Sequence, residues 1–195
     1  MNKTNIRRAD TERLAILALL TGLVAILSYL GGFIKLGSLA SINLTLIPVV
    51  LGAAYVGPLA GAWLGAVSGI IFFLTPDSAY WMGLSAHGTV ITVMLKGILA
   101  GLCAGLVYKL LENKNRYLAV FAASIVCPIV NTGIFLLGCL TFFMDAVNSG
   151  AAANEMSVFG FMIVFYVGLN FVFELIVNVV LNPVITKVLN VVKKN

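Results

Sequence analysis

Uncharged apolar runs, separated by short polar segments, extend along almost the whole chain. Four runs without a single charged residue cover residues 14–34, 36–76, 117–144 and 156–173. A helix of about 20 residues crosses the ~30 Å hydrocarbon core of a bilayer. The pattern therefore predicts an all-α membrane protein with six transmembrane helices, at residues 14–29, 43–55, 58–74, 88–111, 117–143 and 157–189.

The second predicted span is short, and the basic residues decide how it is interpreted. Residues 43–55 would extend only about 20 Å as a helix, so a re-entrant segment is the alternative to a full crossing. Six crossings place three basic clusters on one face of the membrane and Asp77, Asp145 and Glu155 on the other, as the positive-inside rule prefers. We therefore predict six helices with both termini in the cytoplasm. The clusters are Lys3, Arg7, Arg8 and Arg13; Lys109, Lys114 and Arg116; and Lys187, Lys193 and Lys194.

Composition favours a single integral membrane domain over residues 1–195. Hydrophobic residues make up 61% of the chain and charged residues 10%, and the mean hydropathy is +1.08. Outside the predicted spans, the sequence leaves a cytoplasmic N-terminal segment at residues 1–13 and a cytoplasmic tail at residues 190–195. The net charge of +5 is explained by the positive-inside rule and does not indicate nucleic-acid binding.

Lys96 lies inside the fourth predicted span. A charged side chain near mid-membrane costs several kcal/mol unless it is paired or faces a cavity, so it is a candidate functional residue. Glu174, in the sixth span, is the carboxylate in an equally apolar setting. Counted from the cytoplasmic charges, Lys96, Asn131 and Glu174 all lie ~20 Å from the inner boundary. We predict that they form the floor of a pocket between helices four to six and the outer loops; a Lys96–Glu174 pair that only holds two helices together is the alternative.

The sixth span carries a polar residue at every fourth position, namely Asn170, Glu174, Asn178 and Asn182. This interval places the four side chains along one side of a helix. A polar stripe on a helix in lipid must face protein or water. We therefore include Asn170 and Asn178 in the predicted pocket; a stripe continuing to the inner face would favour a stand-alone carrier or channel.

The outer loop at residues 75–88 supplies Tyr80, Trp81 and the single histidine, His87, to the rim of the predicted pocket. Aromatic residues at that depth commonly anchor a protein at the membrane interface. They also stack on flat ligands in binding pockets. Further aromatic residues near the same depth are Phe72, Phe73, Phe142 and Phe143.

Glycine recurs at every fourth residue in the third and fourth predicted spans. Small residues at this interval let helix backbones approach closely in lipid. We interpret the two rows as packing seams, either inside the bundle or, for Gly61 and Gly65, toward a partner subunit. The rows are Gly57, Gly61, Gly65 and Gly69, and Gly97, Gly101 and Gly105.

Several catalytic and metal-binding motifs do not occur in the sequence. Without GxxxxGK[ST] the chain has no P-loop for ATP. Without HExxH or CxxC, and with one histidine, it offers no recognisable metal site and no convincing acid–base pair for a membrane enzyme. Cys103, Cys127 and Cys139 lie in apolar spans, and their odd number argues against a disulfide framework. We predict a binding protein that is not an enzyme and uses no cofactor or metal.

Four segments together carry a family resemblance. Residues 42–69, INLTLIPVVLGAAYVGPLAGAWLGAVSG, combine a proline in a short helix, Pro48, with a GPLAGA turn into the next helix. They are followed by LKGILAGLCAGLVYK at 95–109, PIVNTGIFLLG at 128–138 and NFVFELIVNVVLNPVI at 170–185. In this order the segments resemble the substrate-binding S components of energy-coupling factor (ECF) vitamin transporters, of the branch that includes pantothenate, folate and riboflavin binders.

The resemblance implies a six-helix protein of the bacterial plasma membrane that captures a vitamin from outside. Delivery would require a shared transmembrane coupling subunit and two cytoplasmic ATPases. Small residues on the first helix would dock the coupling subunit; here they are Ala15, Ala18 and Gly22, in place of the family's alanine-x-x-x-alanine pattern. Lys96 stands where relatives often have an arginine, and keeps the charge without the bidentate fork. A lysine favours a carboxylate such as that of pantothenate, whereas the aromatic residues suit a flat ring such as that of riboflavin.

Overall fold

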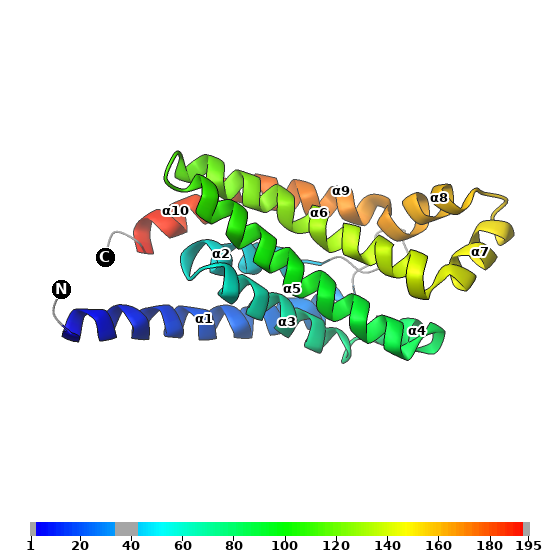
Figure 1. Ribbon diagram of the computed structural model, residues 1–195, viewed down its shortest axis with the longest axis horizontal. Helices are drawn as coiled ribbons and strands as arrows, with labels where there is room; N and C mark the ends of the chain where they lie inside the picture. Colours follow the sequence, from blue (N-terminus) through cyan, green and yellow to red (C-terminus); the bar gives the residue numbers. More distant parts are fainter. Residues whose placement is uncertain (1–2, 34–42, 193–195) are drawn as a thin grey trace.

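The computed structural model describes residues 3–33 and 43–192, and within these ranges every regular element is a helix (Figure 1). This confirms the prediction of an all-α protein. The elements are α1 (Lys3–Gly31), α2 (Leu46–Tyr55), α3 (Pro58–Phe72), α4 (Pro76–Leu84), α5 (Ala86–Leu111), α6 (Arg116–Phe142), α7 (Met144–Ala153), α8 (Val158–Phe161), a π-helical segment η1 (Met162–Val167), α9 (Gly168–Val180) and α10 (Asn182–Val192).

Four helical stretches in the described ranges are long and apolar enough to cross a membrane by themselves. They cover residues 11–31, 86–111, 116–142 and 170–187, and the number rises to six if each of two sharply bent helix pairs counts as one span. The second predicted span is α2, whose ten residues extend only about 15 Å. The short length expected for this element is therefore observed.

The long helix α5 packs against α3 on one side and α6 on the other. The α3–α5 contact is a glycine seam in which Gly61 lies against Gly101 and Gly65 against Gly97. A Cβ atom at Gly65 would overlap the carbonyl oxygen of Gly97, so the two backbones touch directly. This position corrects the alternative in which Gly61 and Gly65 face a partner subunit, because both are buried inside the bundle.

The segments between the third and fourth and between the fifth and sixth predicted spans, which the topology places outside the membrane, are largely helical. In the first, α4 begins with Pro76 and carries Asp77 in its first turn, an arrangement that favours helix initiation. It bends by 85° from α3, and α7, in the second segment, makes an angle of 94° with the helix that follows it. Both short helices lie at the same end of the bundle (Figure 1).

The sixth predicted span, residues 157–189, is not one continuous helix. It begins as α8, widens into the π-helical segment η1 and breaks at Gly168, whose φ of 45° favours glycine. A single turn residue, Leu181, separates α9 from α10 just before Pro183, which has no N–H to donate to the preceding turn. The span is therefore broken near its outer end at Gly168, whereas residues 170–187 still form one membrane-length helical stretch.

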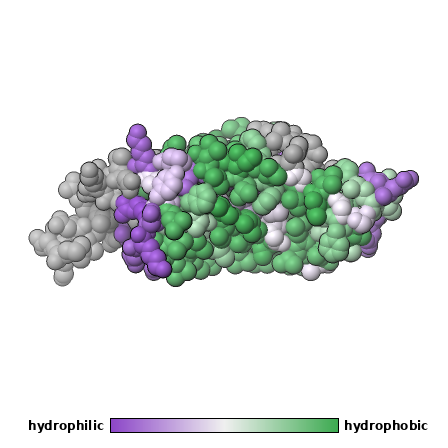
Figure 2. All heavy atoms as spheres, turned by 90° about the horizontal axis from the view of Figure 1, so that it is seen from above, coloured by the Kyte–Doolittle hydropathy of each residue, from purple (hydrophilic) through white to green (hydrophobic). Residues whose placement is uncertain are grey.

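Polar residues gather at the two ends of the molecule, and an apolar band lies between them (Figure 2). The start of α1, the turn between α5 and α6, and the end of α10 lie at one end of the bundle (Figure 1). That turn carries the basic cluster of Lys109, Lys114 and Arg116. The positive-inside rule assigns this end to the cytoplasm and the end with α4 and α7 to the outside.

Candidate functional site

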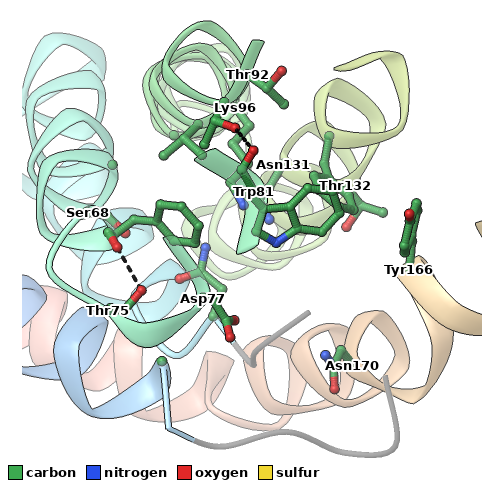
Figure 3. A pocket seen from close by; sticks show the side chains of 18 of the residues that line it. Ser68, Thr75, Asp77, Trp81, Thr92, Lys96, Asn131, Thr132, Tyr166 and Asn170 are labelled. Atoms are coloured by element: carbon green, nitrogen blue, oxygen red, sulfur yellow. Dashed lines mark hydrogen bonds between the residues drawn. The ribbon is translucent and has the colours of Figure 1, made fainter. Parts of the chain in front are cut away.

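A cavity lies in the outer half of the bundle, bordered by residues of α1, α3, α4, α5, α6, η1 and α9. Its volume is about 110 Å³; since one water molecule needs roughly 10–15 Å³ on this scale, the cavity has room for several waters or part of a small organic molecule. Figure 3 shows Ser68 and Thr75 on one side, Tyr166 and Asn170 on the opposite side, and Trp81 between them.

Lys96 of α5 borders the cavity, as its position in the sequence predicts. Its Nζ atom lies 5.3 Å from the centre of the Phe135 ring and 5.8 Å from that of Phe72. A cation over an aromatic face at such a distance is attracted by the ring electrons, more strongly where water is scarce. The two rings thus hold the ammonium group at the cavity wall.

Glu174 of α9 also borders the cavity and is almost fully buried. Its Oε1 atom accepts a hydrogen bond of 2.7 Å from the backbone N–H of Asn43, just before α2. In the described parts of the chain, the contacts of Lys96 and of Glu174 do not include an ion pair with each other. Each charge is therefore held by other groups, and the ammonium of Lys96 is not neutralised by direct contact with the carboxylate.

A chain of side-chain hydrogen bonds borders the cavity beside Glu174. The hydroxyl oxygens of Ser28 in α1 and Ser68 in α3 lie 2.8 Å apart, and that of Thr45 lies 3.0 Å from Ser68. Thr45 also donates to the side-chain oxygen of Asn43. Through Asn43 the chain connects α1 and α3 with Glu174 in α9. Sequence reasoning missed these residues, although Asn43, a polar residue at the start of the second predicted span, is a signal that points to them.

Trp81 of α4 is buried, with 4% of its surface exposed, and forms one wall of the cavity. Its ring lies edge-on to those of Phe143, Phe135 and Tyr166, at centroid distances of 5.2, 5.3 and 5.4 Å. The sequence pointed to Trp81 and Phe143 but not to Phe135 or Tyr166. These aromatic side chains come from α4, α6, the residue that follows α6, and η1, and all of them line the cavity.

Asn131 and Thr92 border the cavity with polar atoms that lack a protein partner among the described residues. Asn131 is 5% exposed and Thr92 is 3% exposed, and the atoms concerned are Asn131 Oδ1 and Thr92 Oγ1. Buried polar atoms usually have a hydrogen-bond partner in a protein or in water. These two atoms are therefore available to a bound molecule.

Five of the eight predicted pocket residues border the cavity: Lys96, Asn131, Glu174, Asn170 and Trp81. The other three lie elsewhere. Tyr80 is 47% exposed and lies edge-on to the outer part of the aromatic wall at Trp81, and His87 is exposed at the start of α5. Asn178 lies one turn below Glu174 and donates to its backbone carbonyl oxygen at 2.8 Å.

The family model described as "ECF transporter, substrate-specific component" matches residues 12–186. The chain belongs to this family. As an ECF substrate-specific component, it is a multi-pass membrane protein that binds a small-molecule substrate and works with ECF coupling and ATPase subunits, and it is not an enzyme. No curated protein and no solved structure matches the chain.

Proposed function

We propose that this ECF substrate-specific component captures a carboxylate-bearing vitamin from outside the cell, with pantothenate as the best candidate, and binds its carboxylate with Lys96. The observation that carries the proposal is the position of the Lys96 ammonium group. It borders the cavity, contacts the rings of Phe72 and Phe135, and is not paired with Glu174. A ligand carboxylate in the cavity would place an anion in direct contact with this ammonium group.

The surroundings of Lys96 favour such a ligand energetically. A hydrogen bond between charged partners is roughly twice as strong as one between neutral groups, and its electrostatic part increases where water is excluded. Asn131 and Thr92 offer further polar atoms to hydroxyl or amide groups of the same molecule. A substrate with a carboxylate at one end and several polar groups along its length would use all of them.

A flat-ring vitamin such as riboflavin is the second candidate, and the aromatic wall favours it. Trp81, Phe135 and Tyr166 all border the cavity, and aromatic side chains in pockets commonly stack on planar ligands. In this alternative, the ring of the vitamin would lie against Trp81. Lys96 would then be a polar group of the cavity wall without an ionic contact to the ligand.

Purification from cells grown in rich medium, followed by mass spectrometry of the released small molecules, tests the two candidates. The expected result is a vitamin with a free carboxylate, present in amounts comparable to the protein. A ring compound without a carboxylate would overturn the proposed role of Lys96 and favour the second candidate. Recovery of no vitamin, together with unaided solute transport by the chain in liposomes, would favour a stand-alone carrier.

We further propose that α1 docks the coupling subunit in the bacterial plasma membrane. Ala15, Ala18 and Gly22 are exposed on this helix, and a Cβ atom added at Gly22 would meet no atom within 4 Å. Small exposed residues on a membrane helix allow the close approach of a second helix. This surface is therefore suited to a helix of the coupling subunit.

Ala18→Leu is expected to leave vitamin binding unchanged and to lower vitamin uptake at least threefold, because the added side chain holds the docking helices apart. Binding to the purified protein and uptake by cells that express the whole transporter are the two measurements. Gly133→Leu adds similar bulk to an exposed, open position on α6 and serves as the control. Equal loss of binding and uptake in Ala18→Leu would mean that this face of α1 is needed for folding.

A further inference from the structure

Buried polar atoms without a protein partner continue below the cavity. In the described ranges they are the hydroxyl oxygen of Ser124 in α6, the side-chain oxygen of Asn178 in α9 and the amide nitrogen of Asn182 in α10. Ser124 is 0% exposed, and Asn178 and Asn182 are each 1% exposed. The other polar atoms of the two asparagines are occupied, since Asn178 donates to the Glu174 carbonyl and Asn182 accepts from Thr186.

The three residues lie at similar depths on helices that pack together. Both α9 and α10 contact α6, and α6 runs in the opposite direction to them (Figure 1). At 1.5 Å per residue, Ser124 lies about 10 Å below Asn131. Asn178 and Asn182 lie about 6 and 12 Å below Glu174 by the same count. Since Asn131 and Glu174 both border the cavity, this count places the unpartnered atoms roughly 6–12 Å beneath it on adjoining helices.

Three buried polar atoms without a hydrogen-bond partner, from protein or water, would lower the stability of the fold considerably. A buried donor or acceptor without a hydrogen bond loses its full solvation, and no lipid or apolar side chain can replace that loss. Proteins usually solve this by enclosing ordered water, which makes about three hydrogen bonds to otherwise unsatisfied groups. Ser124, Asn178 and Asn182 together offer the donors and acceptors that such waters need.

We propose that ordered water fills the interface between α6 and α9–α10 beneath the cavity, and that this hydrated seam ends at an apolar plug. The seam consists of Ser124, Asn178 and Asn182. The plug consists of Val120, Ile185 and Leu189, which are 0%, 2% and 1% exposed and belong to one apolar cluster at the cytoplasmic side of the seam.

The seam and the plug divide the route to the cytoplasm into two parts. A molecule that moved from the cavity toward the cytoplasm along the interface of α6 with α9 and α10 would first meet the hydrated seam. It would then meet the apolar plug. Among the described residues, the plug interrupts the polar path along this interface.

Cysteine accessibility tests the hydrated seam. In a variant whose Cys103, Cys127 and Cys139 are replaced by alanine and which still elutes as a single species, Ser124→Cys is expected to react with methanethiosulfonate ethylammonium. Val120→Cys is the matched control, because it is equally buried on the same helix and lies one turn nearer the cytoplasm. Expected is at least tenfold faster labelling at position 124 than at position 120. Equal rates at the two positions would overturn the proposal.

A stability measurement provides an independent test that does not use a reagent. Ser124→Ala removes only the hydroxyl group, so it should lower the unfolding midpoint by about 2–4 °C if that hydroxyl holds water. In a dry seam the same change would remove an unsatisfied atom, and the midpoint would stay constant or rise. The latter result would overturn the proposal even if the cysteine variants fail to fold.

Discussion

Gly65→Ala is expected to prevent α3 from packing against α5 and to abolish the folded protein. A Cβ atom at this position would overlap the backbone carbonyl group of Gly97, which cannot rotate away as a side chain can. Overpacking of a core typically costs about 1–3 kcal/mol where side chains can adjust. Here the two helices must separate along the whole seam, so the cost should exceed that range. The measurement is the fraction of detergent-solubilised protein that elutes as a single species.

Gly133→Ala is the matched control for this prediction. Gly133 is exposed on α6, and a Cβ atom there would meet nothing within 4 Å. The control should behave as the native protein or be slightly more stable, since alanine favours helices by up to about 1 kcal/mol over glycine. Normal elution of Gly65→Ala would contradict the direct backbone contact between α3 and α5.

The glycine seam illustrates what spacing in the sequence does and does not determine. A glycine at every fourth residue predicts one smooth helix face, and that face exists in both α3 and α5. Spacing carries no information about what covers the face. The sequence therefore left open whether Gly61 and Gly65 meet a neighbouring helix or another subunit, and only the position of α5 answered this.

The sequence did not predict the two outer helices, α4 and α7, for a related reason. The segments that form α4 and α7 are short and mix small, polar and aromatic residues, so they have no apolar stripe of helical period. Their helical form depends on packing: Trp81 of α4 and Val147 of α7 are buried in one aromatic cluster with Phe161. The break at Gly168 was also invisible, because the apolar run continues across it.

The depth of the candidate site could be predicted from the sequence, because helices have a fixed rise per residue. Counting from the basic clusters placed Lys96, Asn131 and Glu174 at one level, and all three border the same cavity. Lateral contacts could not be obtained in this way. The hydrogen bond from Asn43 to Glu174 joins residues 131 positions apart, and it separates two charges that sequence reasoning left as a possible pair.

This separation has a consequence for how the site is built. Glu174 holds the segment before α2 through its hydrogen bond with Asn43. The side chain of Asn43 is in turn hydrogen-bonded to Thr45, which is linked through hydroxyl groups to Ser68 and Ser28. The carboxylate thus has a structural partner on one side of the cavity. Among the described residues, the ammonium of Lys96 lies against the aromatic faces of Phe72 and Phe135 on the other side. This arrangement supports the proposal that Lys96, and not Glu174, binds the ligand.

Lys96→Ala is therefore expected to weaken binding of the vitamin found by mass spectrometry more than tenfold, which corresponds to at least ~1.4 kcal/mol. In the proposed binding mode the variant loses the cation that faces the ligand's carboxylate, while Glu174 keeps its hydrogen bond from Asn43. Isothermal titration calorimetry on the purified protein provides the measurement. Lys109→Ala removes an exposed lysine from the cytoplasmic end of the same helix and should bind as the native protein does.

A third variant separates the ligand's charge requirement from the architecture of the helix bundle. Lys96→Arg keeps the positive charge but changes its shape, so it should retain more affinity than Lys96→Ala. If Lys96 served only to balance Glu174 at a distance, Glu174→Gln combined with Lys96→Ala would restore both stability and binding. If it contacts the ligand, the double variant regains stability at most, because the carboxylate of the vitamin still lacks its cation. Native affinity in a well-folded Lys96→Ala protein would assign the lysine to architecture alone.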